Sequence, residues 1–360
     1  MGDRKIRIGI MTFHWACNYG AVIQAYALQE YIKQRYDCEV EIIDYYPDSF
    51  RYTLKKAFTP SYPSVMIHRL KEFLRERKIK DFRENLTLSS HYSSTKQLQE
   101  YVDQYDLLVC GSDQIWNPSF TRSGEGELTT AYFLDFGGEC KRISYAASFG
   151  CKQYPSDLIT SVVDLLDRFD HISVREATGV DLIYQLTKKE SIRVCDPTML
   201  PDSSLFLKHV DVKKTQHLIG VYSLRGINLG GFANICKSQL EGATAIKHIK
   251  SNTIPEWLET IYCSKLFITN SFHGMMMALR FHRNFAVLLE KGTLSGMNDR
   301  FITVLDELGL TNHIIEELTI EEANRICRLF IDWAEVDEKI DIYRKESIAY
   351  LDTAIRECYE

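Results

Sequence analysis

Residues 265–281, KLFITNSFHGMMMALRF, place an amide, a hydroxyl and an imidazole between an apolar run and a helical pattern. Asn270, Ser271 and His273 supply these groups. The first backbone amides of a helix favour bound anions, and an imidazole can donate a proton or hold a phosphate. A lone histidine on an apolar face is more often structural, but the polar neighbours favour an anion or proton-transfer site around His273.

A second dense polar motif is GSDQIWNP, residues 111–118, which directly follows the apolar run DLLVC. Ser112, Asp113 and Gln114 offer a hydroxyl, a carboxylate and an amide, and Trp116 offers an aromatic face. Sugar hydroxyls need paired donors and acceptors, and an aromatic ring can cover the CH surface of a sugar. The motif therefore predicts sugar recognition. A structural turn is the alternative, although it explains Asp113 and Gln114 less well.

The segment TFHWACNYGAVIQAYAL, residues 12–28, leads from an apolar run into a helical pattern. Asn18 can cap that helix, and Gly20 can allow close approach to the backbone. The exposed amides of the helix start would then form an anion or substrate site. An ordinary helix cap is the alternative.

Two arginines also stand at predicted helix starts. Arg175 lies in HISVREATGVDLI, and Arg300 follows Asn298 in SGMNDRFITVLDELGL. A guanidinium matches the oxygens of a phosphate or a carboxylate. For Arg175 the alternative is a surface arrangement with Glu176 that has no special role.

Alternating strand and helix patterns must position these groups. Short apolar runs bounded by charge or turn residues predict buried strands. Strands are expected at residues 6–12, 39–46, 106–110, 131–136, 141–148, 171–174, 192–196, 217–223, 244–249, 265–269 and 285–289. Helices are expected at residues 20–35, 64–85, 255–263 and 300–309, after residues 270–274 and within 319–358. The pattern predicts an α/β protein with doubly wound parallel sheets.

The 360 residues are long enough for two domains, and the segment 197–214 loses its periodicity as a linker would. We expect a Rossmann-like domain at residues 1–205, a second one at 215–318 and a helical segment at 319–360. Ligands of such sheets bind outside the carboxyl ends of the strands, so the cleft between the domains is the expected site.

Composition and the absence of certain motifs narrow the range of possible functions. A formal charge of −6 argues against nucleic acid as a partner, and the charged run LKEFLRERKIK is typical of a solvated helix face. The sequence has no apolar run of membrane-spanning length, no signal-peptide pattern and ten scattered cysteines, which together predict a cytoplasmic protein with reduced thiols. Motifs for NAD, for a P-loop and for zinc are absent, and no Asp-x-Asp pair suggests a metal.

Several motifs in one order carry a resemblance to a known family. They are NYGAVIQAYAL, GSDQIWNP, RISYAASFG, SVRE, CDPT, EWLETIYCSKLFITNSFHG, and the RF and VLDELGL segments of residues 300–310. Over about residues 6–315 the chain resembles the polysaccharide pyruvyl transferase family. The resemblance implies a glycosyltransferase-B-like fold of two Rossmann-like domains. It also implies transfer of the pyruvyl group of phosphoenolpyruvate to two hydroxyls of a sugar, forming a cyclic ketal in a bacterial cell-surface glycan.

The resemblance further implies that phosphoenolpyruvate is the donor substrate, bound by the C-terminal domain, with no cofactor or metal. A glycan or lipid-linked sugar would be the acceptor on the N-terminal side. His273 would be the acid or the phosphate contact, and Arg175 would hold the donor. From its residue type, Asp113 is expected to activate or orient an acceptor hydroxyl.

One position departs from the family pattern. Some relatives carry an arginine two positions before this histidine, where this chain has Ser271. Arg300, Arg280 or Arg283 would then have to complete the donor site. Two other functions stay open on the same scaffold. One is a glycosyltransferase that uses a nucleotide sugar, and the other is a glycan-binding module without catalysis.

Overall fold

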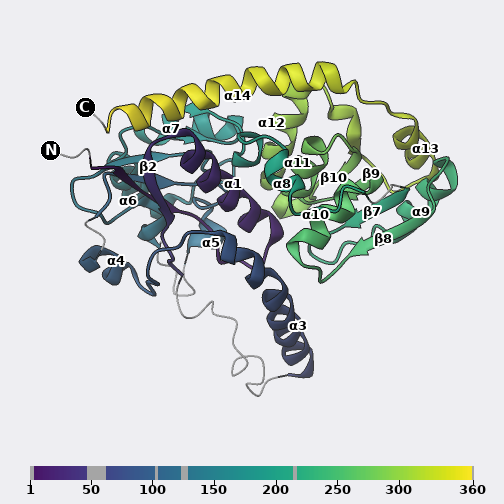
Figure 1. Ribbon diagram of the computed structural model, residues 1–360, viewed down its shortest axis with the longest axis horizontal. Coiled ribbons are helices and arrows are strands. Elements are labelled where there is room, and N and C mark those ends of the chain that lie inside the picture. Colours follow the sequence, from purple (N-terminus) through teal and green to yellow (C-terminus); the bar gives the residue numbers. More distant parts are fainter. Residues whose placement is uncertain (1–3, 47–61, 102–103, 123–128, 214–216, 359–360) are drawn as a thin grey trace. The chain divides into compact units, whose positions relative to one another are not determined.

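The computed structural model describes residues 4–46, 62–101, 104–122, 129–213 and 217–358 (Figure 1). The chain divides into two compact units. The first unit comprises residues 1–73, 83–200 and 342–360, and the second comprises residues 74–82 and 201–341. Each unit is built on its own parallel sheet.

The sheet of the first unit has the strand order β2-β1-β3-β4. Its strands are β1 (Ile6–Met11), β2 (Cys38–Ile42), β3 (Leu107–Cys110) and β4 (Lys141–Ser144). A short parallel pair, β5 (Ser173–Val174) and β6 (Ile192–Arg193), is linked to it by bridges from Ile143 to His171 and from Ala147 to Val174. All four residues of β3 are buried, as expected for a strand covered on both faces.

Helices connect these strands as a doubly wound fold requires. They are α1 (Tyr19–Arg35), α3 (Pro63–Lys80), α4 (Thr95–Tyr101), α5 (Pro118–Thr121), α6 (Ile159–Leu166) and α7 (Ala177–Thr187). Helix α3 belongs to the first unit up to Phe73 and to the second unit from Leu74. The start of α1 is fixed by Asn18, whose side chain accepts a hydrogen bond from the backbone amide of Gly20.

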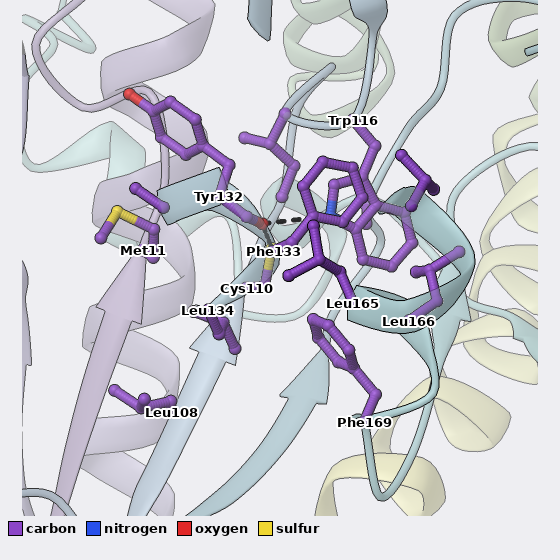
Figure 2. Close-up of a cluster of buried hydrophobic side chains, with 14 of the residues drawn as sticks. Met11, Leu108, Cys110, Trp116, Tyr132, Phe133, Leu134, Leu165, Leu166 and Phe169 are labelled. Carbon is purple, nitrogen blue, oxygen red and sulfur yellow. Dashed lines mark hydrogen bonds between the residues drawn. The ribbon is translucent and has the colours of Figure 1, made fainter. Parts of the chain in front are cut away.

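The core of the first unit is built around Trp116 (Figure 2). Its ring stacks on Phe133 at a centroid distance of 5.6 Å, and Phe169 packs edge-on against it. The indole Nε1 donates to the carbonyl of Tyr132 at 3.1 Å. Because Trp116 is 0% exposed, the expectation that its face covers a sugar ring is wrong.

The strand expected at residues 131–136 is also wrong. Residues Thr130–Phe133 form a 3-10 helix, and Leu134 has a left-handed backbone with φ of 55°. The apolar side chains of this segment enter the core from a turn instead of from a strand. The Arg142 guanidinium donates to the carbonyls of Leu134 and Phe136 in this segment, and to those of Gly138 and Cys140 after it, so these carbonyls are paired without a sheet.

The sheet of the second unit has the order β11-β10-β9-β7-β8. Its strands are β7 (Leu218–Tyr222), β8 (Ala245–Ile249), β9 (Ser264–Thr269), β10 (Asn284–Leu288) and β11 (Ile314–Ile315). Its helices are α8 (Ser204–Leu207), α9 (Gly230–Gln239), α10 (Ile254–Tyr262), α11 (Phe272–Arg280), α12 (Asp299–Leu308) and α13 (Ile320–Arg328). Strand β7 lies between β8 and β9, so the chain reverses its winding direction there, where ligands of such sheets bind.

The last helix, α14 (Trp333–Arg356), contributes residues up to Asp341 to the second unit and residues from Ile342 to the first. The division after Leu200 lies inside the expected linker of residues 197–214. The domain bounds expected from the sequence, including a separate helical segment at residues 319–360, stay predictions. Among the described residues, no helix combines the length and the apolar character needed to cross a bilayer.

Candidate functional site

In the first unit, polar side chains gather at the carboxyl ends of β3, β5 and β6. Asp113 and Gln114 follow β3, Arg175 and Glu176 follow β5, and Asp196 follows β6. Parallel strands present their carboxyl ends at one edge of a sheet, which is the usual ligand edge. We call these five residues the first-unit cluster.

Arg175 is the centre of this cluster. Its side chain is 1% exposed, and its Nη1 donates to Asp196 Oδ2 at 2.9 Å, while its Nη2 lies 3.6 Å from Asp113 Oδ1. Burial lowers the pKa of the guanidinium, but the charges of Asp196 and Asp113 outweigh this effect and raise the pKa. Arg175 is thus held by two carboxylates of its own unit. Its expected contact with the donor stays a prediction.

Asp113 and Gln114 lie on a loop with unusual backbone geometry. Asp113 has a φ of 77°, and its Oδ1 also accepts from the amide of Gln114 at 2.9 Å. The Gln114 side chain lies against Gly150, where an added Cβ would come within 2.6 Å of Gln114 Nε2. Gln114 Nε2 is buried and has no hydrogen-bond partner among the described residues.

Glu176 is a residue whose importance the sequence did not show. Its Oε1 accepts hydrogen bonds from the Ser148 hydroxyl and from the backbone amides of Phe149 and Gly150. Burial raises the pKa of this carboxyl, although the Arg175 charge and these hydrogen bonds oppose the rise. Glu176 Oε2 is buried and lacks a hydrogen-bond partner among the described residues. Glu176 therefore positions the loop that packs against Gln114.

Ser112 connects this edge to the start of α1. Its hydroxyl donates to the carbonyl of Ala146 at 2.9 Å, and its amide donates to Gln24 Oε1 at 3.2 Å. Gln24 in turn donates to the Thr12 hydroxyl, next to β1. The Asn18 side chain accepts from the Gly20 amide and caps α1. This is the capping role that the sequence offered as the alternative. Substrate contacts of Ser112, Asn18 and Gly20 stay predictions.

A second polar group that the sequence did not reveal lies at the ends of β1 and β2. Asp44 Oδ1 is 2.9 Å from His14 Nε2, and Asp44 Oδ2 is 3.2 Å from His91 Nδ1. Burial tends to raise the pKa of Asp44, but the hydrogen bonds and charges of the two imidazoles lower it below its usual value. This carboxylate ties the two strand ends to the loop that carries His91.

In the second unit, polar groups gather where β7, β9 and β10 end. Asn270 follows β9, and its amide exchanges hydrogen bonds with the backbone of Leu224 and donates to Glu290 Oε1 at 3.2 Å. Glu290 also pairs with Arg225 at 2.5 Å. The Asn298 side chain makes two hydrogen bonds to the backbone of Glu290. Its Nδ2 donates to the Glu290 carbonyl at 2.8 Å, and its Oδ1 accepts from the Glu290 amide at 2.9 Å. Glu290 and Arg225 were not expected, because neither belongs to a recognisable motif.

His273 lies at the start of α11. Ser271 caps the helix by accepting from the amide of Gly274 at 3.2 Å, and its own amide donates to Thr269 Oγ1. His273, at the second position of the helix, is 5% exposed, and its ring meets Phe272 edge-on at 5.4 Å. The imidazole therefore sits within the first helical turn, where the dipole favours negative charge.

Arg300 approaches the same helix start from α12. Its guanidinium lies 5.2 Å from the ring centre of Phe272 and 5.6 Å from that of Phe301. The other two candidate cations are at the far end of α11. Arg280 donates to the carbonyl of Pro201, and Arg283 lies 4.6 Å from the ring of Tyr262, just before β10 begins. Of the three arginines, only Arg300 is brought to the His273 end of α11. We call Asn270, Ser271, His273, Asn298 and Arg300 the second-unit cluster.

Two further observations bear on ligands. A surface hollow lined by Asp106, Lys141 and Glu357 lies at the amino ends of β3 and β4, and no expected site residue lines it. Among the described residues, no group of three or more His, Cys, Asp or Glu side chains could hold a metal ion. The metal-free reaction stays a prediction.

Comparison with known proteins adds to this geometry. The sequence profile of the polysaccharide pyruvyl transferase family matches residues 18–292, about three quarters of the chain. No curated protein sequence is significantly similar to the chain.

Two solved structures show the same fold. The Staphylococcus aureus protein MnaA, in a co-structure with UDP, is 10% identical with a TM-score of 0.51, over 98% of this chain and 97% of that one. Arabidopsis thaliana UGT89C1, complexed with quercetin, is 11% identical with a TM-score of 0.50, over 99% of this chain and 100% of that one. The expected glycosyltransferase-B-like fold of two Rossmann-like units is confirmed.

Proposed function

Because the chain belongs to the polysaccharide pyruvyl transferase family, we propose that it transfers the pyruvyl group of phosphoenolpyruvate to two hydroxyls of one sugar. The product is a cyclic ketal, and the acceptor is a glycan or lipid-linked sugar destined for the cell surface. The observation that carries the proposal in this chain is the arrangement at α11, where an imidazole and a guanidinium approach one helix start.

The donor requires this kind of site. Phosphoenolpyruvate carries a phosphate and a carboxylate, which suit helix-start amides and a planar cation. The proposal assigns the donor to the second-unit cluster, with Arg300 and the first amides of α11 as anion ligands. His273 then holds the phosphate or supplies a proton.

The proposed reaction balances without a cofactor. Protonation of the methylene carbon makes the adjacent carbon electrophilic, and the first sugar hydroxyl attacks it and loses its proton. The C–O bond to phosphate then breaks, and the second hydroxyl attacks the same carbon and closes the ring. The proton of this second hydroxyl leaves with the phosphate. One acid and one base are needed, and each works best with a pKa near the operating pH.

The first-unit cluster is proposed to receive the acceptor. Asp113 is the candidate base or orienting group for a hydroxyl, and Arg175 fixes Asp113 from a buried position. Gln114 Nε2 and Glu176 Oε2 support the assignment, since buried polar atoms are usually paired and sugar hydroxyls are suitable partners. Ser112 and Asn18 hold the surrounding loops.

The proposal is tested by measuring phosphate release from phosphoenolpyruvate with a panel of sugar acceptors, for the unaltered protein and for His273→Gln. Release that needs both an acceptor and His273 supports it. Release that survives the substitution removes His273 from the reaction.

The glycosyltransferase alternative predicts a different donor. The S. aureus structure contains UDP, and its similarity to this chain concerns the fold alone. Thermal stabilisation by a nucleotide sugar and not by phosphoenolpyruvate would favour a glycosyltransferase. Binding of glycans without turnover of either donor would favour a glycan-binding module.

A further inference from the structure

Two cysteines of the second unit meet between helices α9 and α13. The two helices pack against each other, and their side chains share an apolar core with those of β7 and β9 (Figure 1). Cys236 lies on α9 and Cys327 on α13. Cys327 Sγ donates to the carbonyl oxygen of Cys236 at 3.7 Å, and the two thiols are also hydrogen-bonded to each other. Residues 91 positions apart in the chain are thus in contact within one unit.

The two thiols differ in access and in acidity. Cys236 is 0% exposed, whereas Cys327 is partly exposed. The hydrogen bond from the Cys236 thiol lowers the pKa of Cys327 because it stabilises the thiolate, and the same hydrogen bond, together with burial, raises the pKa of Cys236. The thiolate is the nucleophilic form of cysteine. Cys327 is therefore the thiol that a reagent can reach and that reacts first, and Cys236 is a second thiol directly behind it.

Other partly exposed thiols of the chain are less acidic. Burial raises the pKa of Cys38, Cys151 and Cys358 to about 11, so each is protonated at neutral pH. A cysteine that responds to oxidants typically combines a low pKa, access to solvent and a neighbouring second thiol. Cys327 has all three properties.

We propose that Cys327 and Cys236 form a redox-responsive site, which reacts with small-molecule disulfides and closes into a reversible disulfide between α9 and α13. Both side chains belong to the second unit, and the inference does not depend on the proposed transfer reaction.

The exchange takes place in two steps. Cys327 loses its proton and attacks one sulfur of the small-molecule disulfide, whose S–S bond breaks, and the released sulfur takes up a proton. Cys236 then loses its proton and attacks the Cys327 sulfur of the mixed disulfide. The second small thiol leaves and takes up a proton. Two electrons pass from the protein thiols to the reagent, and an excess of the small thiol reverses both steps.

The cross-link would enclose much of the second unit. The loop from Cys236 to Cys327 contains strands β8 to β11 and the whole second-unit cluster. A disulfide across a loop of this length mainly restricts the unfolded chain. Oxidation is therefore expected to hold the second unit together under conditions that unfold the reduced protein.

The test exposes the full chain at neutral pH to increasing ratios of glutathione disulfide to glutathione. Remaining thiols are then alkylated, and each cysteine is assigned by peptide mass spectrometry. Cys327→Ala removes the first thiol, and Cys236→Ala removes the second. Cys151→Ala, at a partly exposed thiol of the first unit, is the matched control. The same exchange in concentrated urea gives the behaviour of the unfolded chain.

We expect the peptides of Cys236 and Cys327 to become linked in the unaltered chain and in the control. Cys236→Ala should instead hold one glutathione on Cys327, and Cys327→Ala should leave the buried Cys236 unmodified. Without any substitution, alkylation of the reduced chain should label Cys327 at least about tenfold faster than Cys38, Cys151 or Cys358, because its thiolate is more abundant. In urea this preference should disappear.

Three results would overturn the proposal. The first is equal alkylation rates for Cys327 and the three other thiols. The second is a glutathione adduct that stays on Cys327 of the unaltered chain without exchange to Cys236. The third is an equal yield of the Cys236–Cys327 link in urea and in native buffer. None of these measurements uses phosphoenolpyruvate, so this inference and the proposed function can fail separately.

Discussion

The guanidinium of Arg300 lies over the ring of Phe272, 5.2 Å from its centre, and Phe272 directly precedes His273. Two helices that are separate in the chain, α11 and α12, thereby bring a cation and an imidazole to the same helix start. The aromatic face holds the guanidinium in place by a cation–π contact. In the proposed donor site, this cation would take the place of the arginine that some relatives carry at the position of Ser271.

Substitution of Arg300 tests this relationship. Arg300→Met should raise the KM for phosphoenolpyruvate by more than about tenfold, since charge-assisted hydrogen bonds to an anion contribute about 1.5–3 kcal/mol. Arg300→Lys should recover only part of this loss because it lacks the planar fork. Steady-state phosphate release measures the effect. Arg283→Met, at the other end of α11, is the matched control and should leave KM unchanged.

The imidazole has its own prediction. His273→Gln should lower kcat by about 10²–10⁴-fold, the usual contribution of a positioned acid or base. His248, exposed in the same unit, is the control, and His248→Gln should retain normal turnover. Equal losses in both variants would show that the assay reports on folding and not on chemistry.

The pairing of Arg175 with Asp196 predicts a stability effect. Arg175→Met should lower the free energy of unfolding by about 3–5 kcal/mol, because it leaves a buried carboxylate without its partner. Urea unfolding measures this change. Arg175→Lys separates the two roles by kinetics. If Arg175 positions Asp113, this variant should lower kcat with little change in KM. If Arg175 contacts the donor, as the sequence predicts, the variant should raise the KM for phosphoenolpyruvate and leave kcat unchanged.

Asp44 predicts a pH dependence. Its pKa is depressed in the folded chain, so its stabilising effect is complete above the unfolded value of about 3.9 and is lost as pH falls through the folded value. Asp44→Asn should therefore cost about 1–3 kcal/mol at neutral pH and progressively less at lower pH. Urea unfolding across the acid range measures the difference. A cost that stays constant down to the lowest pH would contradict the ion-pair account.

Gly111 and Gly226 form a matched pair of glycines with positive φ. At Gly111 an added Cβ would lie 2.1 Å from the carbonyl oxygen of Tyr145, whereas at Gly226 nothing lies within 4 Å. Gly226→Ala should cost about 1–2 kcal/mol from backbone strain alone. Gly111→Ala should cost clearly more, because the backbone that carries the Asp113 loop must move. Thermal unfolding of both variants provides the comparison.

Much of the fold could be predicted from the sequence, since buried parallel strands are continuous apolar runs. Strands β1, β3, β7 and β9 lie where those runs predicted. Helix α9 was missed because it opens with Gly230 and Gly231, although Phe232, Ala233 and Cys236 form its buried face. The segment 131–136 was misassigned because an apolar run gives no sign that Arg142, a few residues further along the chain, will bind the carbonyls of Leu134 and Phe136.

The candidate sites were only partly predictable for a related reason. Polar residues directly after a strand, such as Asn270 and Asp113, are visible in the sequence. Glu290 and Asp44 also follow strands, but their partners Arg225 and His91 come from distant parts of the chain. Those pairs depend on how strands are ordered in a sheet, which local patterns do not encode.

The central claim is that phosphoenolpyruvate binds at the start of α11. A crystal structure with phosphoenolpyruvate or an unreactive analogue tests it most directly. The account predicts ligand density with the phosphate on the first amides of α11 and within hydrogen-bond distance of Arg300 and His273. Density for the analogue elsewhere, with α11 unoccupied, would contradict it.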